Sequence, residues 1–189
     1  MNLSLLLQMA AEAAPDRIGL VCEGRRWSYV ALLAAARSAA ASIAASGCTH
    51  VGLLDESSAA APIAFFGAAL AGVPYVPLNY RLADLDLSAL LDRIAPAYLI
   101  GDADRISRLS PGGGHRVWRR ADFVSQAQAP IGHRPAEEDA PDGIAVQLFT
   151  SGTTAAPKAA LLRHGNLLSY ILGTVEFGSA AEQEAALVS

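Results

Sequence analysis

The sequence is poor in lysine, cysteine and basic charge, and each shortage limits what the chain can do. Lysine occurs once, at position 158, whereas the other basic side chains are all arginine. Two cysteines, Cys22 and Cys48, cannot build a disulfide framework, so a reducing, cytoplasmic compartment is expected. The formal net charge of −4 offers no basic surface for nucleic acid. Cys48 and His50 lie close together but lack a second ligand pair, which argues against zinc.

Uninterrupted hydrophobic runs are also scarce. Residues 59–78 carry no charge and are long enough to span a bilayer. Prolines and glycines interrupt this stretch at Pro62, Gly67, Gly72, Pro74 and Pro77. They favour a short helix, a stop and a strand instead of a span. The N-terminal stretch 1–15 has no basic segment and contains Glu12, so it does not resemble a signal peptide. No transmembrane segment is expected.

The remaining composition is that of a folded α/β domain. Hydrophobic residues make up 52% of the 189 residues, which excludes a disordered chain. The apolar pattern predicts helices that end before Pro15, near Ser46, near Ala71 and before Pro96, and another over 165–172. It predicts strands over 18–22, 25–29, 50–55, 73–78, 97–102, 115–118 and 144–150. Residues 107–114 are expected to be irregular, and 125–143 to form a surface connection. Alternating strands and helices predict a mainly parallel sheet covered on both faces.

The most informative stretch is LFTSGTTAAPKAALLRHGNL, residues 148–167. It follows an apolar strand, and open parallel sheets bind ligands at the carboxyl ends of their strands. Its hydroxyl donors are Ser151, Thr153 and Thr154. Gly152 allows backbone N–H groups to approach a ligand closely, and clustered donors form an anion-binding hollow. Lys158 adds a compact positive charge that suits phosphate. The combination favours a polyphosphate ligand.

Two familiar catalytic loops do not match this stretch. The Gly-Lys-Ser/Thr ending of a Walker loop is missing. No G-x-S-x-G pattern surrounds Ser151, which excludes a serine-hydrolase elbow. The residues alone leave one alternative open, because runs of Ser, Thr, Gly and Pro also form ordinary surface turns.

The same stretch closely resembles the phosphate-loop signature of AMP-forming acyl-CoA synthetases and their adenylate-forming relatives. These relatives include peptide-synthetase adenylation domains and firefly luciferases. The resemblance extends to RRWSYVALLAAARSAAASI and FFGAALAGVPYVPLNYRLADLDLSALL, which occur in the family's order. Together these segments span most of the chain. The chain is therefore identified as a member of this superfamily, with the fold of its N-terminal subdomain: a mainly parallel sheet flanked by helices.

The resemblance implies a two-step reaction. A carboxylate, most simply that of a fatty acid, attacks the α-phosphate of ATP to give an acyl-adenylate and pyrophosphate. A thiol, usually that of coenzyme A, then displaces AMP. By the family's pattern, Thr150 would help to coordinate Mg²⁺, and Ser151, Gly152, Thr153 and Thr154 would line the phosphates. Lys158 would stabilise the charge that grows on the departing pyrophosphate.

The chain departs from the family's pattern at two positions of the loop. Ala155 stands where glycine is usual, and Ala159 replaces the glycine that normally follows the lysine. A methyl group in a left-handed backbone costs about 1–2 kcal/mol. Either these two residues adopt a negative φ here, or the loop is stiffer and less well poised for phosphate.

Other matched residues are expected to serve structure. His164 corresponds to a histidine that commonly follows the loop, and it is expected to help to open the next helix. Asn79 and Arg81 are expected to form a structural connection. Trp27 and Tyr29 alternate with polar neighbours, which is typical of packing in a sheet.

Several parts that the family needs do not occur in residues 1–189. One is the acidic residue of an aromatic-Gly-x-Thr-Glu motif, which shares Mg²⁺ with the loop, and another is the aspartate that binds the ribose. The others are the hinge to the mobile C-terminal lid of these enzymes and the catalytic lysine of that lid. Residues 1–189 are therefore expected to be the N-terminal part of a larger AMP-binding domain, inactive alone and able to self-associate through uncovered apolar surface. The alternatives are a peptide-synthetase adenylation domain, a fatty-acyl-AMP ligase, or a non-catalytic fragment that binds partners or oligomerises.

Overall fold

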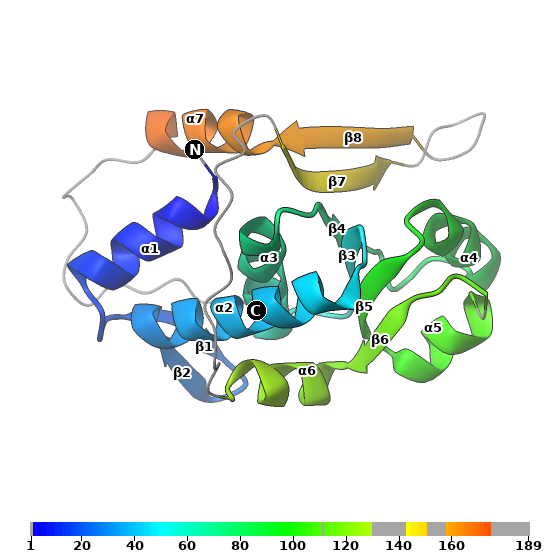
Figure 1. Ribbon diagram of the computed structural model, residues 1–189, viewed down its shortest axis with the longest axis horizontal. Coiled ribbons are helices and arrows are strands. Elements are labelled where there is room, and N and C mark those ends of the chain that lie inside the picture. Colours follow the sequence, from blue (N-terminus) through cyan, green and yellow to red (C-terminus); the bar gives the residue numbers. More distant parts are fainter. Residues whose placement is uncertain (1, 111, 130–142, 151–157, 175–189) are drawn as a thin grey trace.

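The computed structural model describes residues 2–110, 112–129, 143–150 and 158–174 (Figure 1). Its helices are α1 (Ser4–Ala13), α2 (Tyr29–Ser46), α3 (Ala60–Ala71), α4 (Asp84–Arg93), α5 (Ala103–Leu109), α6 (Arg120–Ala127) and α7 (His164–Thr174). Its strands are β1 (Ile18–Cys22), β2 (Arg25–Ser28), β3 (His50–Leu54), β4 (Tyr75–Pro77), β5 (Ala97–Gly101), β6 (Arg116–Arg119), β7 (Ile144–Thr150) and β8 (Lys158–Arg163). The alternation of helices and strands in the first hundred residues matches the expectation from the sequence.

The main sheet has six strands in the order β6-β5-β3-β4-β7-β8. Strand β3 pairs in parallel with both β4 and β5, and the parallel pairs β5–β6 and β4–β7 extend the sheet on either side. Strand β8 closes one edge and runs antiparallel to β7. Strands β1 and β2 form a separate antiparallel hairpin. The expected α/β architecture with a mainly parallel sheet is confirmed.

Helices cover both faces of this sheet. In β5, Tyr98 and Ile100 join one buried cluster, whereas Ala97 and Leu99 join the other, as the two-residue period of a strand requires. The first cluster packs under α2, α3 and α6. The second packs under α4 and α5. All five residues of β5 are buried, so this strand lies at the centre of the molecule.

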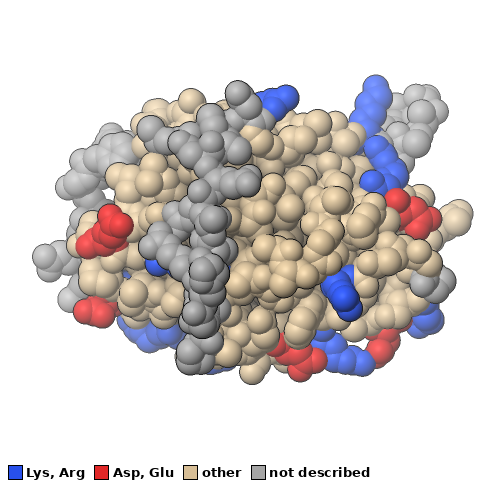
Figure 2. All heavy atoms as spheres, viewed as in Figure 1, with Lys and Arg blue, Asp and Glu red and all other residues tan. Residues whose placement is uncertain are grey.

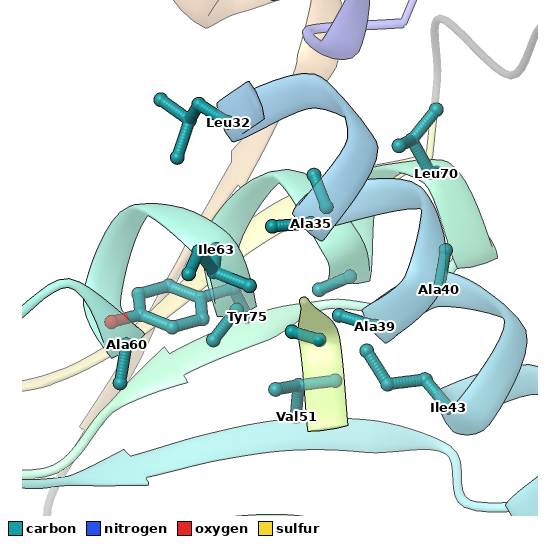
Figure 3. Close-up of a cluster of buried hydrophobic side chains, with 14 of the residues drawn as sticks. Leu32, Ala35, Ala39, Ala40, Ile43, Val51, Ala60, Ile63, Leu70 and Tyr75 are labelled. Carbon is teal, nitrogen blue, oxygen red and sulfur yellow. The ribbon is translucent and has the colours of Figure 1, made fainter. Parts of the chain in front are cut away.

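Alanine allows α2 and α3 to approach closely. Ala36, Ala39 and Ala40 of α2 are completely buried. Figure 3 shows Ala39 and Ala40 on this helix. A Cβ atom added to Gly67 of α3 would lie 2.9 Å from the Cβ of Ala39, so only glycine fits there. By length and composition, α2 could cross a membrane. Because α1, α3 and α6 all pack against it, its apolar composition is explained by burial inside the protein.

The uncharged stretch 59–78 divides as the sequence predicted. Its first part forms α3, which Gly72 ends with a left-handed backbone at φ +73°. The chain then enters β4, which comprises three residues before the next connection. Ser58 lies just before the cap position Ala59, and its Oγ accepts a hydrogen bond from the N–H of Ala60 at 3.3 Å.

Two helices correct the expectations of irregular structure. Helix α5 includes the first part of 107–114, which was expected to be irregular. The Asp102 carboxylate accepts a hydrogen bond from the Arg105 N–H at 2.9 Å and so caps this helix. Helix α6 likewise extends into 125–143, which was expected to be a surface connection. Burial of Phe123 and Ala127 stabilises it. Both helices are short and begin directly after a strand, which hides them in a periodicity search.

Two further differences concern β8 and Tyr29. Strand β8 was not expected, because its sequence KAALLR suits a helix as well as a strand. Pairing with β7 decides its conformation. Tyr29 was expected to pack within a sheet, but it is the first residue of α2. Its ring nevertheless lies against Gly19 of β1, where an added Cβ would come within 2.5 Å of the ring.

Candidate functional site

The two residues that bracket the candidate phosphate loop, Thr150 and Lys158, lie at the paired ends of β7 and β8, called the β7–β8 hairpin below. The two strands are paired from Ile144↔Arg163 to Thr150↔Lys158, so the residues that bracket the loop face each other across the hairpin. The Thr150 hydroxyl donates a hydrogen bond to the Lys158 carbonyl oxygen at 3.4 Å. This pairing fixes the two ends of the loop against each other at the carboxyl end of β7.

Four of the six predicted site residues lie outside the described residues: Ser151, Gly152, Thr153 and Thr154. The structure places the other two, Thr150 and Lys158, and brings them together. Both are exposed to solvent, as a site that takes up a nucleotide requires. Because the Thr150 hydroxyl uses its hydrogen in the bond to Lys158, its oxygen lone pairs remain available as ligands.

Ala159 carries no backbone strain. It pairs with Phe149 inside the β7–β8 ladder. Glu23 is the only non-glycine residue with a positive φ in the part of the chain that the structure describes. Ala159 therefore adopts an ordinary negative φ, and its methyl group incurs no left-handed penalty. Ala155, the other departure from the family's pattern, lies outside the described residues.

A cation lies beside the strand that leads into the loop. The guanidinium of Arg93, at the end of α4, stacks over the ring of Phe149 at 4.8 Å from the ring centre. Phe149 also packs against the second buried cluster. The contact joins α4 to β7 one residue before Thr150, and it adds positive charge on that side of the hairpin.

His164 lies at the other end of the hairpin, where β8 meets α7. It is 2% exposed, and its backbone N–H donates to the Gly143 carbonyl oxygen at 3.1 Å. Its Nδ1 accepts a hydrogen bond from the N–H of Leu3 at 3.3 Å. Burial lowers the pKa of His164 below its usual value of 6.5, which favours the neutral ring. Because Nδ1 is the acceptor, the neutral ring carries its proton on Nε2. The expectation that His164 opens α7 is confirmed, but its contact with the N-terminus was not foreseen.

Away from the hairpin, a hollow with a volume of about 430 Å³ lies at the carboxyl ends of β3 and β5. Asp55, Asp102, Arg105 and Arg120, which line it, already have partners. Arg105 binds the carbonyls of Tyr80 and Leu82 at 2.7 and 2.6 Å, and Arg120 lies 3.5 Å from Asp55. Sequence reasoning missed this cluster because its members come from four separate connections. Its bonds join those connections together.

A serine, a histidine and an aspartate also meet near β6, but not as a nucleophilic triad. Ser110 Oγ donates to Asp92 at 2.9 Å and lies 3.2 Å from His115 Nε2. His115 Nδ1 accepts from the Ala97 N–H at 3.1 Å, so Nε2 of the neutral ring carries the proton. The ring therefore cannot accept a proton from Ser110. This cluster fixes the connection that precedes β6.

The remaining residues of interest serve structure. The Asn79 side chain accepts from the Arg81 N–H at 3.0 Å, and Arg81 stacks on Tyr80, so both residues shape the connection between β4 and α4. Within the described residues, no group of three or more His, Cys, Asp or Glu side chains could hold a metal. Figure 2 shows Lys and Arg dispersed among acidic and uncharged residues on one face, without a continuous basic area there.

Comparison with known proteins decides the family. The family profile described as "AMP-binding enzyme" matches residues 7–188, almost the whole chain. The chain belongs to the AMP-binding enzyme family. Its relatives include a medium/long-chain-fatty-acid–CoA/3-oxocholest-4-en-26-oate–CoA ligase of Mycobacterium tuberculosis, which is 26% identical over 95% of this chain. The chain spans 36% of that ligase. Tyrocidine synthase 1 of Brevibacillus parabrevis is 29% identical over 87% of this chain, which spans 16% of it.

Solved structures of the same family share the fold. A fatty acyl CoA synthetase of Mycobacterium tuberculosis superposes with a TM-score of 0.74 and 26% identity, over 86% of this chain and 34% of that one. ATP-bound MatB from Rhodopseudomonas palustris also gives a TM-score of 0.74 with 26% identity, over 91% of this chain and 37% of that one. This member of the AMP-binding enzyme family therefore shares its fold with part of those enzymes.

Proposed function

We propose that this chain supplies the phosphate-binding part of an enzyme that activates a carboxylic acid with ATP. The observation that carries the proposal is the β7–β8 hairpin, which pairs Thr150 with Lys158 at the two ends of a loop rich in hydroxyl groups. Membership of the AMP-binding enzyme family supports it. Since the chain spans 36% of its ligase relative, residues 1–189 would form the N-terminal part of the domain and the rest would complete the site.

The residues divide the chemistry between them. Ser151, Gly152, Thr153 and Thr154 would donate hydrogen bonds to the β- and γ-phosphates of ATP. The ammonium of Lys158 would stabilise the negative charge that develops on pyrophosphate as the substrate carboxylate forms its bond to the α-phosphorus. Thr150 Oγ1 fits Mg²⁺, because magnesium in nucleotide sites takes only one or two protein oxygens beside the phosphates. Mg²⁺, when bound there, would supply positive charge to neutralise phosphate oxygens.

The acceptor and substrate that we propose are coenzyme A and a fatty acid. The M. tuberculosis relative is named for both, and it aligns with 95% of this chain. In the second step the thiol would attack the acyl carbon, and AMP would leave. Cys22 and Cys48 are buried and free, which agrees with our placement of the enzyme in the reducing cytoplasm.

A peptide-synthetase adenylation domain is the second candidate, and the match to tyrocidine synthase 1 favours it. That enzyme class would load an acyl group onto a carrier protein, as a fatty-acyl-AMP ligase would also do. Activation of amino acids in preference to fatty acids would identify this candidate. A non-catalytic oligomerisation module is a third candidate, for which the exposed Leu161, Tyr170 and Leu172 would provide apolar surface.

Replacement of Lys158 tests the proposed role of the loop. In the full-length gene product, Lys158→Ala should lower ATP–pyrophosphate exchange by about 10²–10³-fold, because a charge at the leaving group is lost. The free energy of unfolding should change by no more than about 0.5 kcal/mol, since the side chain is exposed. Lys158→Arg should restore part of the activity, because its planar group replaces a compact ammonium.

Arg163→Ala, at the other end of the same strand, is the matched control and should keep most of the exchange activity. Thermal unfolding is measured beside exchange for every variant. Near-normal exchange in Lys158→Ala, or a loss that follows unfolding alone, would show that Lys158 is structural and that the proposed role is wrong.

A further inference from the structure

We propose that His164 is a positioning residue that holds the phosphate-loop hairpin against the N-terminal helix. The proposal rests on the proposed function, because it explains how Lys158 would be held in place for the phosphates. His164 touches neither Thr150 nor Lys158. It acts at the opposite end of the hairpin, where the first pair is Ile144↔Arg163 and the last is Thr150↔Lys158.

The bonds of His164 join three distant parts of the chain. Its backbone N–H donates to the carbonyl oxygen of Gly143, which precedes β7. Its ring Nδ1 accepts a hydrogen bond from the backbone N–H of Leu3, 161 residues away. Leu3 is itself fixed, because the neighbouring Asn2 side chain donates to the Ala69 carbonyl of α3 at 2.7 Å. The result is a continuous connection from the buried core helix α3, through the start of α1, to the junction of β8 and α7.

Most of strand β8 is exposed in the part of the chain that the structure describes, which makes this connection important. Five of its six residues are exposed, and β7 is its pairing partner at the edge of the sheet. Leu162 is the one residue of β8 that packs against the first buried cluster, and in the next segment Leu167 packs against the same cluster and Leu168 of α7 is buried. Figure 1 shows the resulting arrangement, with α7 and the hairpin lying along one side of the molecule and α1 beneath α7. Edge strands with so little cover open locally at low free-energy cost unless an end is held.

Histidine suits this position for two reasons. Helix α1 begins at Ser4, and the Leu3 N–H belongs to its first turn, where backbone donors have no partner within the helix. A neutral ring provides an acceptor for that donor while it fills buried space. An apolar ring of similar shape would fill the space but leave the N–H of Leu3 buried without a partner, which is costly. Asparagine would retain an acceptor, because its Oδ1 can take the place of Nδ1.

Two substitutions separate the acceptor from the bulk of the ring. His164→Phe keeps the shape and removes the acceptor, whereas His164→Asn keeps the acceptor. His115→Phe is the matched control, because His115 Nδ1 also accepts a backbone N–H, from Ala97 near the opposite edge of the sheet. Amide hydrogen exchange of β8 is measured in the full-length gene product, together with KM for ATP and kcat in pyrophosphate exchange.

We expect His164→Phe to speed hydrogen exchange of the Lys158–Arg163 amides by about tenfold or more. KM for ATP should rise by about tenfold, with a smaller change in kcat, because the lysine is present but less well held. In His164→Asn, the hydrogen-exchange rates of β8 and KM for ATP should both lie closer to the wild-type values than in His164→Phe. His115→Phe should leave β8 exchange and KM unchanged, even where it lowers overall stability.

Exchange of β8 in His164→Phe that is no faster than in His115→Phe would overturn the proposal. Faster hydrogen exchange of β8 with an unchanged KM for ATP would overturn it as well, since ATP binding by the loop would then not depend on the contact between His164 and Leu3. Failure of the proposed function would show separately, as a wild-type protein without carboxylate-dependent pyrophosphate exchange. The hydrogen-exchange comparison would then decide by itself whether His164 holds the hairpin.

Discussion

At the scale of residues, two histidines serve as neutral acceptors inside the fold. His164 accepts the Leu3 N–H and His115 accepts the Ala97 N–H, each through Nδ1. Protonation of Nδ1 would turn each acceptor into a donor that faces another donor. Burial lowers the pKa of both rings from 6.5, and the charge of Asp92 partly offsets this at His115.

These pKa shifts predict a specific dependence of stability on pH. The folded protein binds fewer protons at these rings than the unfolded chain, so the free energy of unfolding rises with pH. The contribution is complete above about pH 6.5 and is lost as the pH falls towards the lowered folded-state pKa. For His164 the free energy of unfolding should therefore be lower at about pH 5.5 than at about pH 7.5. Urea denaturation at both pH values measures it.

His164→Asn supplies the control for this pH dependence. It keeps the acceptor but cannot titrate, so the fall in stability between the two pH values should be smaller in this variant. An equal fall in wild type and His164→Asn would show that other groups cause the pH dependence.

At the scale of elements, small residues determine how α2 and α3 pack. Gly67 meets Ala39 and the Ala36 carbonyl, and both alanines are completely buried. Gly67→Val should therefore lower the free energy of unfolding by about 1–3 kcal/mol, because its side chain would overpack this contact. Chemical denaturation measures the change.

A second helical glycine provides the comparison. A Cβ atom added to Gly173 of α7 would meet nothing within 4 Å. Gly173→Ala should leave stability unchanged or raise it by up to about 1 kcal/mol, through helix propensity. If Gly67→Val is as stable as wild type, the close approach of α2 and α3 is not a constraint on the fold.

How much of the fold follows from the sequence depends on whether an element carries its own signal. Ser28 and Gly47 at the ends of α2 identify that helix, and both cap it in the structure. The apolar strand before the loop is equally clear. By contrast, KAALLR carries no strand periodicity, and β8 exists because β7 pairs with it. Local patterns cannot supply that information.

The same limit applies to the site. The motif predicted that Thr150 and Lys158 belong together, and the structure pairs them across a hairpin. The contact between His164 and Leu3 joins residues 161 positions apart, so no local pattern could predict it. It depends on the packing of α1 against α2 and α3, which is a property of the folded chain.

At the scale of the whole molecule, the chain matches one part of longer enzymes of its family. It has a mainly parallel sheet with helices on both faces, and it spans 36% of its M. tuberculosis ligase relative. Thr150 and Lys158, which bracket the proposed phosphate loop, lie at the paired ends of β7 and β8 and are exposed to solvent. Closure of the site around a nucleotide and an acid would require the remaining part of the enzyme.

The most direct test is carboxylate-dependent ATP–pyrophosphate exchange, measured on the full-length gene product and on residues 1–189 in parallel. Acids of several chain lengths and a set of amino acids are supplied in turn. The full-length protein should exchange pyrophosphate only when a suitable acid is present, with fatty acids preferred, and residues 1–189 alone should give no exchange above the blank. Exchange by residues 1–189 alone, or a folded full-length protein that exchanges with none of the acids, would contradict the account.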